Sequence, residues 1–400
     1  MSESAAPTNI VSTIARDEAI ARARRVAVAV EPNIAEAESL RRMPASNVTA
    51  MMASELDRLL MPKRWGGYGS DDWMTLVDVV AEVARVCGSS GWCFCFLIHH
   101  HWVLGCFPEE TQAEVFRTDQ RPRIVTSFAP MGLLSRVSGG YRLSGEWSWG
   151  SGADHCNFAI VGAHVQPDGE SSLPGWRFVL LSPQEFRIRD VWNSVGLKGS
   201  GSNNIVVNDV FIPEHRTLDT AAFIEGRSPG SRVNDGVLFH QPGFGAFAFG
   251  ILSPLLGMAR GALDAFVELT RSRINLSSGE RTAQLGSIQR KMGESAAEID
   301  AAYAIAKGVN GMLQTQLPLT KEQRIGARRD FAFASRLALR AVDRLFEAGG
   351  AHGLDGSHAL QRFWRDAHAA ANHAVFVYEP LYEAYGGHLL GLPPAPGTIF

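Results

Sequence analysis

A histidine and an aspartate near the end of the sequence have the spacing of a small acid–base site. Asp366 and His373 are seven residues apart, about two helical turns, so on one continuous helix they share a face. Most neighbouring residues are alanine, which leaves room for a flat ring. An imidazole has a pKa of about 6.5, so His373 is a candidate general base. His368 lies about 140° around the same helix from His373 and faces another side. The competing interpretation is a helix histidine satisfied by a neighbour or by solvent.

Three adjacent histidines, His99 to His101, form a second group of candidate side chains. On a helix they point in three directions, so at most one or two face a common site and a metal cluster is disfavoured.

The five cysteines are odd in number and form no C-x-x-C pair. Their pattern predicts buried thiols in a reducing compartment, and the short spacing of Cys93 and Cys95 suits packing better than metal binding. We expect no metal site.

A third group of polar residues closes the segment Leu143-Ser-Gly-Glu-Trp-Ser-Trp-Gly-Ser-Gly152. From residue types alone, Ser148, Ser151 and Gly152 are the polar end of a strand followed by a turn. Chemistry at this segment therefore needs support from elsewhere in the sequence.

Charge and composition restrict the kinds of partner. The 400 residues include 38 Lys+Arg and 41 Asp+Glu, a formal net charge of −3, which predicts neither nucleic-acid nor anionic-membrane binding. The N-terminus lacks the pattern of a targeting segment, and no stretch looks long and apolar enough to span a bilayer. We therefore expect a cytoplasmic protein whose partner is a small molecule or another copy of itself.

The elements that position these residues fall into three regions. Helical periodicity predicts an N-terminal α-helical domain over residues 1–123, and short β-branched runs broken by turn residues predict a central antiparallel β-barrel or sandwich over 124–228. Helical periodicity then returns and predicts a C-terminal four-helix bundle over 229–400. Its expected helices are 251–274, 288–314, 321–348 and 361–385. The fold class is mainly α with a central β domain.

Together these segments resemble a known superfamily. The 143–152 segment, the run Val195-Gly-Leu-Lys-Gly-Ser-Gly-Ser202 and the helix Leu360-Gln-Arg-Phe-Trp-Arg-Asp-Ala-His368 are similar, in order and separation, to the acyl-CoA dehydrogenase superfamily. In detail the chain resembles its flavin-dependent aromatic hydroxylase branch, from about residue 56 to 392. The resemblance implies the oxygenase component of a two-component monooxygenase. Such a component binds reduced flavin (FMNH2 or FADH2), reacts with O2 to give a C4a-hydroperoxyflavin, and hydroxylates a phenol.

The resemblance also implies partners. No Gly-x-Gly-x-x-Gly follows a predicted strand, so we expect no nicotinamide domain and a separate NAD(P)H flavin reductase. A small aromatic substrate and a homotetramer assembled through the bundle follow from the same resemblance. The identity of the phenol, the choice between FMN and FAD, and the reductase stay open.

The resemblance gives flavin-binding roles to individual residues. It places Trp149 beside the flavin ring, Ser151 at flavin N5, and Ser127 of Ile124-Val-Thr-Ser-Phe-Ala-Pro130 near the pyrimidine edge. His240 stands where relatives often have an arginine that contacts this edge. The residues expected near the flavin tail, in the same or a neighbouring subunit, are Arg281, Gly349 and Gly350.

Two histidines receive catalytic and substrate-binding roles. His373 is the expected base for the phenol proton, because a phenol titrates near about 10 and a positioned imidazole can accept its proton as the ring attacks oxygen. His100 is expected to orient the substrate, with His101 as the alternative.

A missing carboxylate separates this chain from the dehydrogenases that it resembles. Their proton-abstracting glutamate lies nine residues after the arginine of an Arg-Asp-Ala helix; here that position is Ala374, and no Asp or Glu occurs from Gly236 to Gly261. Dehydrogenation is therefore the second expectation, with Glu379 and Glu383 displaced along the chain. A sister monooxygenase that oxidises nitrogen or sulfur and a flavin-free helical scaffold that only binds a partner are the further alternatives.

Overall fold

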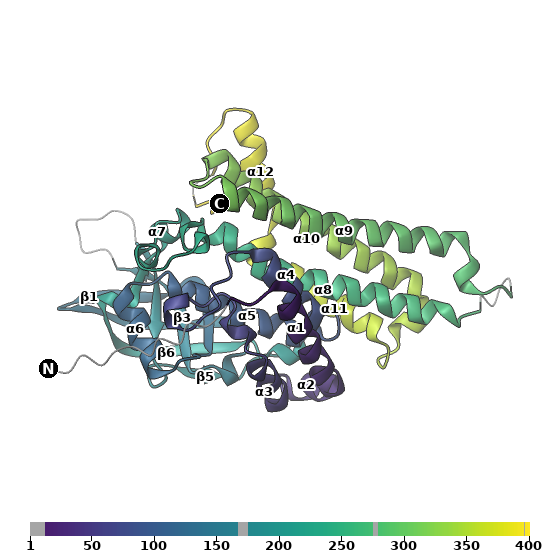
Figure 1. Ribbon diagram of the computed structural model, residues 1–400, viewed down its shortest axis with the longest axis horizontal. Coiled ribbons are helices and arrows are strands. Elements are labelled where there is room, and N and C mark those ends of the chain that lie inside the picture. The colour runs from purple at the N-terminus through teal and green to yellow at the C-terminus, as the bar shows by residue number, and fades with distance from the viewer. Residues whose placement is uncertain (1–12, 167–174, 275–278, 396) are drawn as a thin grey trace.

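The computed structural model describes residues 13–166, 175–274, 279–395 and 397–400. A group of short helices packs beside a sheet, and a bundle of long helices extends away from both (Figure 1). One large apolar core runs through the N-terminal helices and the bundle, and a smaller core lies within the sheet.

The N-terminal region is helical, as predicted. Its helices are α1 (Arg16–Val30), α2 (Ile34–Leu40), α3 (Ala45–Ala53), α4 (Trp73–Ala84), α5 (Gly88–Gly105) and α6 (Glu109–Thr118). Helix α6 begins directly after Pro108 with two acidic residues in its first turn, which favours the helix dipole. Every residue of α5 is buried, so this helix is the central core helix of the region.

The central region is one seven-stranded sheet with the order β5-β6-β2-β1-β3-β4-β7. Its strands are β1 (Ile124–Val137), β2 (Gly140–Gly150), β3 (Phe158–Val165), β4 (Trp176–Leu181), β5 (Arg187–Arg189), β6 (Asn203–Pro213) and β7 (Thr217–Asp219). The expectation of a wholly antiparallel region is wrong at one place, because β1 and β3 pair in parallel. Strand β2 returns from β1 in a tight hairpin and occupies one edge of β1, so β3 adds to the other edge.

The C-terminal region is a helical bundle. After the short α7 (Thr220–Ile224), its helices are α8 (Gly243–Arg271), α9 (Gly286–Thr315), α10 (Lys321–Gly349), α11 (Ala359–Ala371) and α12 (Tyr378–Leu389). Helix α8 packs against both α4 and α10, which joins the bundle to the N-terminal helices.

The predicted fourth helix over residues 361–385 is broken, which corrects the sequence analysis. Helix α11 ends at Ala371, and a short turn of 3-10 helix, Ala374–Phe376, precedes α12. His373 has extended backbone, φ −63° and ψ 140°, and its Nδ1 accepts a hydrogen bond from the Val375 N–H at 3.2 Å. Asp366 and His373 therefore do not share a helix face, and the argument from their seven-residue spacing fails.

Helix α8 also corrects the expectation about membrane spans. By length and composition it could cross a bilayer, with a mean hydropathy of 1.5 over its most apolar window. Of that window, 89% is buried inside the protein, as expected for the core helix of a bundle.

Candidate active site

Five rings from three distant segments form one cluster, which we call the ring cluster. Trp92, Phe96 and His100 follow each other at four-residue intervals, which places them on one face of α5. The ring centroids of Trp92 and Phe96 are 5.3 Å apart and those of Phe96 and His100 are 4.9 Å apart. His373 lies 5.9 Å from Trp92 and 6.4 Å from Phe247 of α8. The structure thus brings His100 and His373 to the same cluster.

Ser151 joins the ring cluster through Trp92. The indole Nε1–H of Trp92 donates to the Ser151 Oγ at 2.9 Å. Ser151 also shares a hydrogen bond of 2.8 Å with the hydroxyl of Ser202, which lies 2.7 Å from the hydroxyl of Ser200. Ser151 and His373 therefore both contact one tryptophan that the sequence analysis did not single out, and His100 is linked to it through Phe96.

The strand ends beside Ser151 have unusual backbone. Trp149 has φ +66°, a left-handed conformation that is costly for a bulky residue, and its indole is 74% exposed. Strands β1 and β2 separate here, and the Ser127 Oγ donates to the Ser148 carbonyl oxygen at 3.0 Å across the gap. The predicted flavin-facing residues Ser127 and Trp149 thus lie at the same end of the β1–β2 hairpin as Ser151.

His100 uses both ring nitrogens within the protein. Its Nδ1 lies 2.7 Å from the Ile124 carbonyl oxygen, which can only accept, so Nδ1 carries the hydrogen. Burial lowers the pKa of His100 to about 3, so the ring is neutral. Its Nε2 then accepts from the Thr126 Oγ1 at 2.9 Å, and the oxygen lone pairs of partly exposed Thr126 remain available. Thr126 was missed, although a hydroxyl beside Ser127 was a usable signal.

Of the other two histidines of the triplet, His101 faces away from the ring cluster, whereas His99 lies on the far side of Phe247, with their ring centroids 4.8 Å apart. The nitrogens of His101 lie 2.6 Å from the Asp57 carbonyl oxygen and 2.7 Å from the Pro122 carbonyl oxygen. His99 is enclosed by aromatic rings, with no hydrogen-bond partner for either nitrogen among the described residues. The structure therefore brings His100, and not His101, to the ring cluster.

His373 presents a donor in this conformation. Because Nδ1 accepts from Val375, the neutral ring carries its hydrogen on Nε2. Burial, with a smaller effect of the Arg328 charge, lowers the pKa of His373 to about 4. A neutral ring with an Nε2–H can donate to a substrate oxygen, whereas the general-base role expected from the sequence requires the other tautomer.

A buried arginine lies next to His373. Arg328 of α10 is 5% exposed, and its Nη2 donates to the Val375 carbonyl oxygen at 3.0 Å. Among the residues that the structure describes, its Nε and Nη1 have no hydrogen-bond partner. Burial lowers the pKa of Arg328 to about 10, so the group is still a cation at neutral pH. The sequence analysis did not single out this residue.

Asp366 supports the serine loop and not His373. Its carboxylate accepts from the Leu197 N–H at 2.6 Å, and burial raises its pKa to about 6. Leu197 begins the turn that carries Ser200 and Ser202, so Asp366 fixes the loop behind Ser151.

The remaining predicted flavin residues are not part of the ring cluster. His240 is exposed in the 3-10 turn Val237–His240. Arg281 lies near the far end of α8, where Arg273 donates to the Gly349 carbonyl oxygen at 3.0 Å and so brings this end close to Gly349 and Gly350. Phe247 and Arg271 of α8 are 24 residues apart, so the helix between them spans about 36 Å. His368, as expected, points elsewhere, with Nε2 at 2.8 Å from Asp343 Oδ1.

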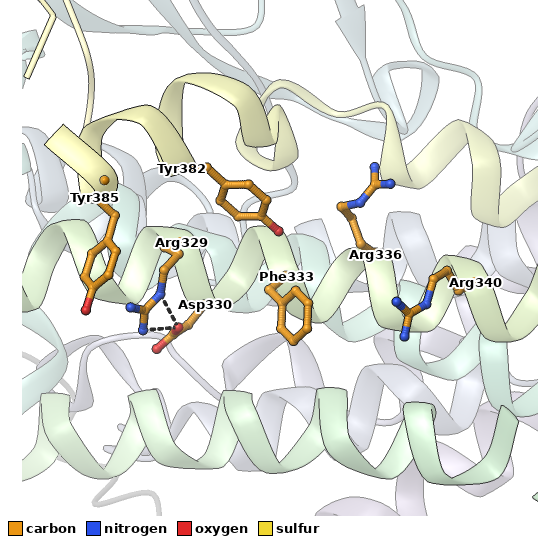
Figure 2. A pocket seen from close by; sticks show the side chains of 8 residues that line it. Arg329, Asp330, Phe333, Arg336, Arg340, Tyr382 and Tyr385 are labelled. Atoms are coloured by element: carbon orange, nitrogen blue, oxygen red, sulfur yellow. Dashed lines mark hydrogen bonds and ion pairs between the residues drawn. The ribbon is translucent and has the colours of Figure 1, made fainter. Parts of the chain in front are cut away.

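A cavity lies apart from the ring cluster, between α10 and α12. It has a volume of about 610 Å³, and Figure 2 shows aromatic and arginine side chains around it. Its lining residues are Arg329, Asp330, Phe333, Arg336, Arg340, Tyr382, Tyr385 and Gly386.

Comparisons with known proteins agree with this geometry. Residues 249–378 match the family model described as acyl-CoA dehydrogenase, C-terminal domain. The oxygenase subunit HsaA, a flavin-dependent monooxygenase of Rhodococcus jostii, is 38% identical over 363 residues, covering 90% of this chain and 94% of that protein. The oxygenase component of an FADH2-dependent resorcinol hydroxylase from a Rhizobium species is 32% identical, covering 94% of each chain.

Solved structures of similar proteins cover the whole fold. The HsaA monooxygenase of M. tuberculosis superimposes with a TM-score of 0.89 at 34% identity, covering 97% of this chain and 100% of that one. XiaF from a Streptomyces species, in complex with FADH2 and glycerol, has a TM-score of 0.87 at 29% identity, covering 96% and 97%.

The chain belongs to the oxygenase components of flavin-dependent two-component aromatic hydroxylases, a branch of the acyl-CoA dehydrogenase fold. The predictions of fold class, enzyme class, and reduced flavin with oxygen as cofactors are confirmed, and a separate flavin reductase follows from the two-component organisation. The residues fit a flavin: exposed Trp149 offers a flat apolar face, and the Ser151 hydroxyl beside it offers a polar partner for a ring edge.

Proposed function

We propose that this chain hydroxylates a small phenol at the ring carbon beside the phenol oxygen, with the flavin against Ser151 and Trp149 and the phenol against His373 and Thr126. One observation carries the proposal: Ser151 and His373, from distant segments, both contact Trp92 of α5, and His100 of the same helix is linked to Trp92 through the ring of Phe96. Bound reduced flavin supplies the activation of dioxygen. The protein supplies binding, orientation, and control of water and protons.

His373 acts as a hydrogen-bond donor to the phenol oxygen. The ring carbon attacks oxygen more readily when the phenol has lost its proton. This form, the phenolate, carries negative charge on its oxygen. The His373 Nε2–H and the nearby Arg328 cation both stabilise negative charge on that oxygen. This role replaces the base role expected from the sequence, because a group with a pKa of about 4 is a weak acceptor for a phenol proton.

His100 acts on the substrate through Thr126. The His100 Nε2 takes the Thr126 hydrogen, so the Thr126 oxygen offers only lone pairs to the substrate side. A phenol O–H or a second ring hydroxyl can donate to it. His100 is thus a positioning residue, and Thr126 is the contact.

Binding of the flavin tail by the expected residues requires a second copy of the chain. Arg281, Gly349 and Gly350 lie about 36 Å along α8 from the ring cluster, which is further than a flavin dinucleotide reaches. We therefore propose that a neighbouring subunit supplies these residues within a homotetramer assembled through the bundle. The cavity between α10 and α12 (Figure 2) is a suitable contact surface, since Phe333 in its lining is 45% exposed.

Four of the five cysteines are buried, which suits our proposal of a cytoplasmic, reducing location.

The test of the function is product analysis with a generic flavin reductase, NADH, FMN or FAD, and a panel of phenols. We expect one oxygen atom to be added beside the phenol oxygen. The chain without reductase should oxidise no NADH. If reduced flavin binds and no phenol of the panel is hydroxylated, the proposed substrate class is wrong; NADH oxidation by the homogeneous chain would exclude the two-component organisation.

The test of the assembly is light scattering of Phe333→Asp. A charge buried at a subunit contact should dissociate the tetramer, whereas Val28→Asp, at a 70% exposed position of α1, should leave it intact. A parent protein that is monomeric at every concentration would contradict the shared flavin site.

A further inference from the structure

Helix α12 is only lightly packed against its own chain. It lies on the outside of the bundle (Figure 1), and its main packing partner among the described helices is α10. Of its 12 residues only Leu381 and Ala384 are buried. At its end Leu389 is 67% exposed and Leu390 is 77% exposed. A short helix that leaves this much apolar surface in water is marginal on its own, so a further surface should cover it.

The exposed end of α12 continues the wall of the cavity between α10 and α12. Tyr385 and Gly386 line this cavity from α12 (Figure 2). Leu389 and Leu390 follow Gly386 by three and four residues, which places them on the same face of the helix. Phe333, 45% exposed, lines the cavity from α10. The cavity lining and the two leucines together form one surface, which we call the α12 groove.

The charges beside the α12 groove are not balanced within one copy of the chain. Arg336 of α10 is exposed and lies over the Tyr378 ring, 4.3 Å from its centroid, and it has no ion pair with a described carboxylate. Glu379 and Glu383 are one turn apart on the exposed face of α12, and neither has an ion pair within the described ranges. The other arginines of the lining already have carboxylate partners: Arg329 with Asp330, and Arg340 with Glu298.

We infer that the α12 groove is the surface on which a second copy of the chain docks, with Glu379 and Glu383 of each copy facing Arg336 of the other. The groove is apolar along its floor, cationic on the α10 side and anionic on the outer face of α12, so it is complementary to itself. A two-fold axis makes such a contact twice and leaves neither groove open. The inference rests on the proposed homotetramer and names the surface and the charges that hold two of its copies together.

This contact also bears on the substrate side of the active site. Helix α12 begins at Tyr378, directly after the turn of 3-10 helix that follows His373. Arg328 donates to the Val375 carbonyl oxygen in this turn and belongs to α10, the other wall of the groove. Docking of a second copy therefore restrains both walls and, through them, the turn that orients His373.

The test is the mass of the particle in solution, measured by analytical ultracentrifugation over a range of protein concentrations. Arg336→Glu places like charges opposite each other at both symmetric positions, so the dissociation constant of the contact should rise at least about tenfold. Glu379→Arg combined with Glu383→Arg should have the same effect. The triple variant with all three changes restores opposite charges and should assemble like the parent. Arg24→Glu, on α1 with a side chain 66% exposed, is the matched control and should leave assembly unchanged.

Hydrogen exchange of the α12 amides gives a second measurement. We expect residues 378–389 to exchange slowly in the parent and in the triple variant, and faster in Arg336→Glu, because α12 loses its cover when the copies separate. All three changed side chains are exposed, so the variants should keep the circular dichroism spectrum of the parent.

Three results would overturn the inference. If the parent is a tetramer and both charge-reversal proteins remain tetramers with parent-like exchange in α12, the groove faces another partner. Dissociation that the triple variant does not reverse contradicts the pairing of these charges. A parent that is monomeric at every concentration refutes the proposed assembly itself, so the failure of the assembly and the failure of this contact are distinguishable.

Discussion

Replacing the buried arginine beside His373 should make the protein more stable and less active. Arg328 is 5% exposed, and burial lowers its pKa from 12.5 to about 10. The difference of about 2.5 units corresponds to about 3 kcal/mol of penalty for keeping the cation folded at neutral pH. A cation with a depressed pKa in the folded state carries this penalty at all pH values below about 10, and the penalty disappears only as the pH rises above its folded-state pKa.

Arg328→Met removes the charge and keeps most of the volume. It also loses the hydrogen bond to the Val375 carbonyl oxygen, worth about 1 kcal/mol, so the net gain in the free energy of unfolding is about 2 kcal/mol. The assay is urea unfolding at fixed protein concentration. Arg24→Met is the control: its guanidinium is exposed and paired with Glu82, so this change should be neutral or slightly destabilising.

The same variant should raise the pKa of His373. Burial is the larger cause of its lowered value, so the pKa of His373 in Arg328→Met should lie above about 4 and still below 6.5. An NMR titration of labelled histidine measures it. Hydroxylation at saturating flavin should fall, because the substrate oxygen loses a nearby cation. A destabilisation of several kcal/mol with an unchanged histidine titration would mean that Arg328 has a compensating partner, and would refute the reasoning.

Three further predictions follow from the site. His373→Ala should still bind reduced flavin and lose most hydroxylation in single turnovers, with partial recovery as rising pH supplies phenolate; parent-like transfer would remove His373 from the mechanism. Thr126→Val should weaken binding of the phenol by about fivefold and leave flavin affinity unchanged, measured by fluorescence titration; a loss of flavin affinity instead would contradict the assigned contact. Because the folded-state pKa of Asp366 is raised to about 6, its burial lowers stability as pH rises from about 4 to 6, so Asp366→Asn should flatten that part of the unfolding profile; an unchanged slope would contradict it.

Local patterns predicted most of the fold. Apolar periodicity placed α8, α9 and α10. The break between α11 and α12 was missed although Pro380, in the first turn of α12, is a signal for a helix start; α11 ends where the His373 side chain caps a new turn. The parallel pairing of β1 with β3 was missed because it depends on which edge of β1 is free, which no single strand encodes.

The site was predictable only in part. His100, Ser151 and His373 came from resemblance, and the structure brings them together. Trp92 looked like one more aromatic residue in an apolar helix, and its role depends on a partner 59 residues away. Arg328 stands in an Arg-rich stretch typical of an exposed helix face, and only the packing of α10 shows that it is buried. The direction of the hydrogen bond at His373, which changed the expected role of this residue, depends on the positions of individual atoms, and a sequence pattern does not determine these positions.

The length of α8 has a genetic consequence. If each flavin lies between the ring cluster of one subunit and the Arg281 end of another, a chain damaged at one end of the helix can still serve a neighbour with its other end. Two proteins with little activity of their own, His373→Ala and Arg281→Ala, would then regain part of the activity when expressed together in one cell. In a mixed tetramer some sites combine the intact half of each parent, as in complementation between alleles of one gene.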